Sequence, residues 1–85
     1  MSKYEKLLIK LLDHRSTISW LEIKFLLGKI GYLEIQKGKT SGSRVAFIHK
    51  SSRHIIRIHR PHPGNELKEY VKRAIIEELK NNHWI

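Results

Sequence analysis

The spacing of apolar residues changes twice along this chain, and the two changes predict its elements. Apolar residues recur at helical spacing, then alternate with polar ones, then return to helical spacing. The helical segments are expected over residues 3–12, 19–30 and 66–79, and the strands over 32–36, 44–49 and 54–59. Short connections favour an antiparallel meander. The chain is therefore predicted to be a single α+β domain, residues 1–85, with three strands packed on helices in the order α-α-β-β-β-α.

Local signals place several ends of these elements. Ser19 and Glu22 form a capping-box pattern that starts the second helix, and Gly31 is placed to end it in a left-handed conformation. Residues 60–65 hold both prolines of the chain and are expected to form a loop. Asn65 is predicted to cap the last helix. The tail is expected to fray unless Trp84 folds back onto the core.

Alternation also predicts which strand residues face the helices. The inward set is expected to be Val45, Phe47, Ile56 and Ile58. The outward set is then Arg44, Arg57 and His59. If the turn over residues 50–53 places His49 opposite His54, Arg44 lies opposite His59, about 4.5–5.5 Å away between Cβ atoms. A slip of one residue would turn His59 inward.

The distribution of charge favours a polyanionic partner. Residues 35–65 contain seven Lys or Arg, four His and no Asp or Glu, in a chain whose net charge is +9. The helices mix both signs, so nucleic acid is favoured over a membrane surface, while an acidic protein partner remains compatible. The chain contains no cysteine, which excludes disulfides and thiolate metal sites and agrees with a cytoplasmic location. No signal peptide or membrane span is expected.

Two motifs resemble the HicA family of bacterial toxins. They are KGKTSGSRVAF, and IIRIHRPHPGNEL followed by an amphipathic helix. The resemblance covers roughly residues 17–80, and residues 1–16 would be an N-terminal helical addition. It implies a fold like that of double-stranded-RNA-binding domains, endoribonuclease activity on messenger RNA without metal or cofactor, and neutralisation by a HicB-type antitoxin. We expect the free protein to be a monomer.

The candidate catalytic residues differ from the family pattern at one position. In HicA proteins the Gly-Ser pair is typically followed by the catalytic histidine, whereas Arg44 follows it here. Arginine keeps its proton and cannot act as a base. His62 falls at the family's second histidine. Our hypothesis is that His59 and His62 provide the acid–base chemistry while Arg44 and Arg57 hold the phosphate.

Further basic and small polar residues are predicted to contact RNA. The predicted RNA-binding set is Lys37, Lys39, Ser43, Arg44, Arg57 and Arg60. Metal binding by His59 and His62 is disfavoured because no carboxylate or thiolate is near in sequence. Outside this set, His49 and His54 are expected to flank the turn, partly exposed, and Lys72 is expected on the solvated face of the last helix.

Two other functions remain open. The chain could bind structured RNA, or less favourably DNA, without cleaving it. A winged-helix-like DNA-binding protein is the weakest alternative, because the exposed side of the second helix offers only Lys24 and Lys29 as basic residues.

Overall fold

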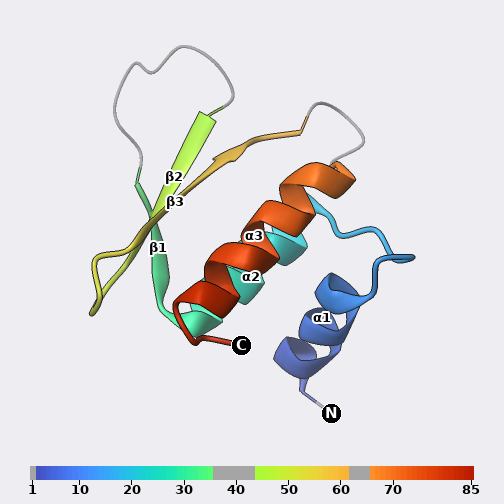
Figure 1. Ribbon diagram of the computed structural model, residues 1–85, viewed down its shortest axis with the longest axis horizontal. Coiled ribbons are helices and arrows are strands. Elements are labelled where there is room, and N and C mark those ends of the chain that lie inside the picture. The colour runs from blue at the N-terminus through green and yellow to red at the C-terminus, as the bar shows by residue number, and fades with distance from the viewer. Residues whose placement is uncertain (1, 36–43, 62–65) are drawn as a thin grey trace.

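The computed structural model describes residues 2–35, 44–61 and 66–85, and it confirms the predicted order of elements (Figure 1). The helices are α1 (Lys3–Leu12), α2 (Trp20–Ile30) and α3 (Glu69–Asn81). The strands are β1 (Tyr32–Ile35), β2 (Arg44–His49) and β3 (Ile55–His59). They form one antiparallel sheet with β2 in the centre, so the predicted α+β class and meander are confirmed.

The helices lie on one side of the sheet and leave the other side open (Figure 1). α2 packs against β1, and α3 packs against β3. α1 lies further from the sheet and packs against α2 and α3. None of the helices in the described parts of the chain is long and apolar enough to span a membrane.

The core fills the space between the helices and the inner face of the sheet. Phe47, Ile56 and Ile58 are buried as predicted, and Val45 is partly buried against the same cluster. Helical residues complete the core, among them Leu11, Trp20, Ile23, Leu26, Leu27, Ile75 and Leu79. The alternation of β3, exposed and buried in turn, therefore sets which of its side chains remain available to solvent.

The predicted ends of α2 are confirmed. The Glu22 backbone N–H donates to the Ser19 hydroxyl, and the Glu22 carboxylate accepts from the Ser19 backbone N–H at 2.9 Å. This backbone hydrogen bond lowers the pKa of Glu22, and Lys10 of α1 lowers it further through a 2.9 Å contact. Gly31 ends the helix at φ +122°, where a Cβ would lie 2.7 Å from a ring nitrogen of His49.

The predicted start of α3 is wrong. The helix begins at Glu69 with Lys68 as its N-cap residue, and no side chain caps it. Asn65 lies outside the described residues, three positions before that N-cap. A tertiary contact instead fixes the approach to α3, because the Leu67 backbone N–H donates to the Ile18 carbonyl at 2.9 Å.

Lys72 is buried, which corrects the prediction that it lies on a solvated helix face. Only 1% of this residue is exposed, and its Nζ donates to the backbone carbonyls of Asp13 and Ser16. These carbonyls belong to the α1–α2 connection, 59 and 56 positions earlier in the chain. The buried ammonium therefore ties α3 to the opposite end of the sequence, and its charge is satisfied by backbone dipoles.

We predict that Lys72→Met lowers the free energy of unfolding by about 1–3 kcal/mol, because it removes the lysine donor from the Ser16 carbonyl and one of the two donors from the Asp13 carbonyl, which also accepts from the Ser16 backbone N–H. Denaturant unfolding followed by circular dichroism measures the change. The matched control is Lys80→Met, at an exposed lysine of the same helix, for which we expect a change within about 0.5 kcal/mol. Equal effects of the two substitutions would contradict this role of Lys72.

Candidate functional site

The register of β2 and β3 is the one predicted from the sequence. Arg44 lies opposite His59, and Ala46 lies opposite Arg57. Arg57 and His59 are two positions apart on β3, so their side chains point to the same side of the sheet, and both are exposed. Arg60 follows directly and is also exposed. We call Arg57, His59 and Arg60 the basic strip.

The remaining predicted site residues are only partly placed. The backbone of Arg44 is described, opposite His59, but its side chain lies outside the described atoms. Lys37, Lys39, Ser43 and His62 lie outside the described residues altogether. Their predicted roles therefore remain predictions, and the part of the site that the structure describes is the basic strip.

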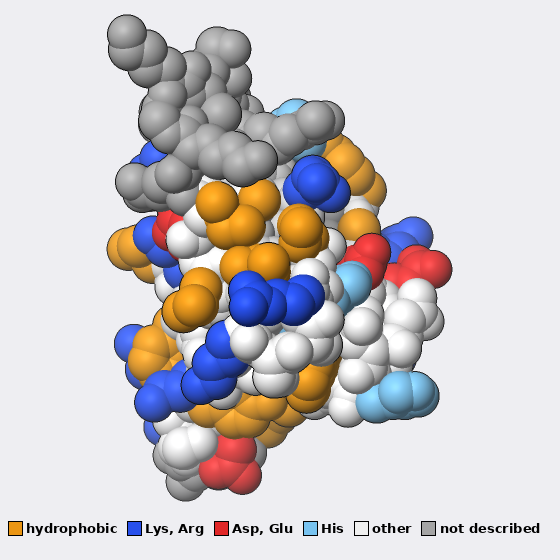
Figure 2. All heavy atoms as spheres, turned by 90° about the vertical axis from the view of Figure 1, so that its left-hand side faces the viewer, with side chains coloured by type: hydrophobic (Ala, Val, Ile, Leu, Met, Phe, Trp, Pro, Cys, Tyr) orange, Lys and Arg blue, Asp and Glu red, His pale blue; other side chains and the backbone are white. Residues whose placement is uncertain are grey.

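The open face of the sheet also holds an apolar row that sequence reasoning missed. Leu33 of β1 lies opposite Ile48 of β2, which lies opposite Ile55 of β3. Leu33 is 58% exposed and Ile55 is 36% exposed. Figure 2 shows this side of the molecule, where hydrophobic side chains gather across the strands with Lys and Arg side chains around them. The alternation of side chains along each strand predicts that each of these residues lies on the open face, but only the register between the strands shows that the three are neighbours.

The arrangement suits proton transfer beside a phosphate. Imidazole can act as a general acid or a general base, and His59 presents one on the exposed side of β3. Arg57, on the same side of the strand, can stabilise negative charge but cannot take a proton. Among the described residues no three His, Asp or Glu side chains are grouped closely enough to hold a metal ion.

Comparison with known proteins assigns the chain to a family. Residues 20–80 match the family model described as the HicA toxin of bacterial toxin–antitoxin systems. This chain belongs to the HicA toxin family. No curated protein and no solved structure matches it significantly. As a HicA family member it is expected to act with an antitoxin. The matched region begins at the first residue of α2, so α1 lies outside it.

His49 of this HicA chain has a structural role, so the prediction that it is partly exposed is wrong. It is 3% exposed. Its Nδ1 accepts from the Ser51 backbone N–H, so its Nε2 carries the proton and donates to the Ile30 carbonyl at 3.0 Å. The Trp84 ring stacks on it with centroids 4.1 Å apart. The C-terminal tail therefore folds back onto the core, with Trp84 packed on His49.

His54 is half-buried beside the turn, as predicted, and links the sheet to α3. Its Nδ1 lies 2.8 Å from the Tyr32 hydroxyl, and its Nε2 lies 2.8 Å from the Glu78 carboxylate. Burial raises the pKa of Tyr32 above its usual value, and the nearby Glu78 charge adds to this effect. Because these contacts occupy both ring nitrogens, His54 is a structural residue of this HicA domain.

We predict that substituting the buried His49 and the exposed His59 has different effects on the free energy of unfolding. His49→Ala should lower the free energy of unfolding by about 2–3 kcal/mol, because it removes a buried hydrogen bond and the packing against Trp84. His59→Ala should change it by less than about 0.5 kcal/mol, because that side chain is exposed. Thermal or denaturant unfolding gives both values. A large loss for His59→Ala would show that His59 supports the fold.

Proposed function

We propose that this protein is the toxin of a type II toxin–antitoxin system, an endoribonuclease that binds and cleaves messenger RNA in the cytoplasm without a metal or other cofactor. The observation that carries the proposal is the basic strip on the exposed edge of the sheet, in a chain of the HicA family. In this proposal residues 17–80 form the double-stranded-RNA-binding-domain-like unit, and residues 1–16 are an addition to it.

The proposed mechanism assigns one task to each type of side chain. His59 takes the proton of a ribose 2′-hydroxyl, which then attacks the adjacent phosphorus and displaces the 5′-oxygen of the next nucleotide. Arg57 and Arg44 stabilise the charge on the phosphate oxygens. His62 protonates the leaving oxygen. Lys37, Lys39, Ser43 and Arg60 hold the flanking phosphates, a sequence-independent contribution that salt weakens.

The test is cleavage of a mixed RNA by the purified protein in the presence of EDTA. We expect His59→Ala to lower the cleavage rate by about 10²–10⁴-fold, the usual contribution of a general acid or base. The control is His14→Ala, at an exposed histidine remote in sequence from the strip, which should cleave at the original rate. Cleavage by His59→Ala at the original rate would exclude His59 as the base.

A second function is favoured by one observation, which is that Arg44 stands where the family has its catalytic histidine. In that case the protein binds RNA, or less favourably DNA, without turnover. Binding that weakens steeply with salt, no cleavage after prolonged incubation, and no growth arrest on expression would establish this alternative.

We infer that a HicB-type antitoxin covers the open face of the sheet. Aliphatic side chains offer no stacking surface for bases, so the apolar row suits a protein better than RNA. The neighbouring Arg57, Arg53 and Lys50 favour acidic groups on that protein. An antitoxin seated there would also obstruct the basic strip, which would block access of RNA.

We predict that Leu33→Asp weakens binding of the antitoxin encoded beside this gene at least about ten-fold, because it places a charge in the apolar row. Titration calorimetry measures the affinity. RNA cleavage by the free toxin should remain unchanged, since Leu33 lies on the strand furthest from His59. Leu21→Asp, at an exposed leucine of α2, is the matched control. An unchanged affinity in the Leu33 variant would place the antitoxin elsewhere.

A further inference from the structure

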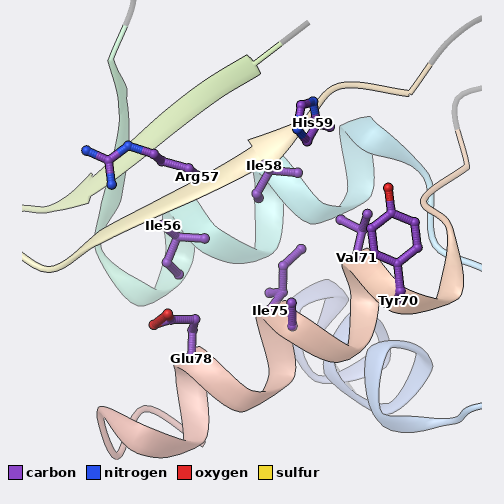
Figure 3. Close-up of a pocket in the computed structure, with 9 residues that line it drawn as sticks. Ile56, Arg57, Ile58, His59, Tyr70, Val71, Ile75 and Glu78 are labelled. Atoms are coloured by element: carbon purple, nitrogen blue, oxygen red, sulfur yellow. The ribbon is translucent and has the colours of Figure 1, made fainter.

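A groove separates the edge strand β3 from α3 (Figure 3). Its volume is about 190 Å³, and its floor is apolar, formed by Ile56, Ile58 and Ile75. Figure 3 shows these three side chains pointing toward one another from the strand and the helix. The groove lies at the edge of the sheet and borders the open face along β3, with which it shares Arg57 and His59.

The two ends of the groove differ in charge. His59 lines one end, on the strand side, and Tyr70 and Val71 face it from the first turns of α3 (Figure 3). Glu78 lines the other end, where its carboxylate contacts His54. The Glu78 carboxylate disfavours a phosphate close to it, while Arg57 and His59 line the strand side of the groove, where a phosphate would find positive charge and a proton donor.

Tyr70 is the unusual residue of this groove. It is 65% exposed, although the groove beside it is apolar. Its hydroxyl makes no hydrogen bond to any residue that the structure describes. Folding therefore gains little from a tyrosine at this position, whereas a flat ring beside an apolar floor is the surface on which an unpaired base stacks.

We propose that the β3–α3 groove holds an unstacked nucleobase of RNA, with Tyr70 as its stacking partner and His59 beside the ribose and phosphate of the same nucleotide. This inference rests on the proposed function and adds to it a substrate class, single-stranded or locally opened RNA. Proteins recognise such RNA by bases that are turned out and stacked on aromatic rings.

The position of the groove explains why a base held there would promote cleavage. His59 belongs both to the groove lining and to the basic strip. A base fixed against Tyr70 positions its own sugar at the strand edge, where His59 could reach the 2′-hydroxyl. Tyr70 is then a positioning residue, because it touches the base and not the reacting atoms.

The experiment compares two oligomers of about ten units, a length typical of such binding sites. One is single-stranded 2′-fluoro RNA, which carries bases but no 2′-hydroxyl and so is not cleaved. The other is a phosphodiester oligomer of stable abasic tetrahydrofuran units. Both carry the same charge, so the ratio of their dissociation constants, measured by fluorescence anisotropy, isolates the contribution of the bases.

We expect the wild-type protein to bind the base-containing oligomer about five-fold to a hundred-fold more tightly than the abasic one. Tyr70→Ala should lose this preference while its affinity for the abasic oligomer stays unchanged. Tyr70→Phe should keep the preference, because the stacking surface remains. Leu21→Ala, at an exposed residue of α2, should behave as wild type. A 5-bromouridine oligomer should crosslink to Tyr70 under ultraviolet light.

Other outcomes overturn the inference in distinguishable ways. If wild type and Tyr70→Ala prefer bases equally, or neither prefers them, the groove holds no base, while salt-sensitive binding of both oligomers leaves the proposed function intact. If neither oligomer nor a natural RNA binds the wild-type protein, the proposed function fails as well. If Tyr70→Ala weakens antitoxin binding alone, the groove belongs to a protein partner.

Discussion

The pairing of β2 with β3 is the constraint on which the rest of this molecule depends. Side chains alternate along a strand, so burying Ile56 and Ile58 beneath the helices forces Arg57 and His59 to the outside. The register then places His59 against Arg44. A shift of one residue would bury the imidazole and expose the core residues, which is why the same packing that stabilises the sheet also positions the candidate chemistry.

Most of the fold could be predicted because its signals are local. The spacing of hydrophobic residues identified every helix and strand. The capping box at Ser19 and the glycine at position 31 located the ends of α2, and the short turn between β2 and β3 determined the register of that hairpin. The errors concern side chains whose partners are distant in sequence. Lys72 looks like a surface lysine until α3 meets the α1–α2 connection, and His49 looks like a turn residue until Trp84 covers it.

Less of the site could be predicted, for a related reason. The pattern of β3 was sufficient to place Arg57 and His59 on one exposed side, and the family resemblance supplied an expected chemistry for them. The apolar row depends on the register of all three strands, and the groove depends on how α3 packs beside β3. Both are products of tertiary packing, as is the position of Tyr70 facing His59, which helical spacing alone marks only as one more apolar residue.

The unequal ends of the β3–α3 groove have a consequence for how a long polymer would be engaged. Glu78 places a negative charge at one end of the groove, and a volume of about 190 Å³ leaves no room for several nucleotides in a row. The polymer would not be threaded from a terminus. One nucleotide would insert its base into the groove, and the RNA on both sides of that nucleotide would continue over the protein surface. Under the proposed function, a site of this shape would act within a transcript and would need no free end of the RNA.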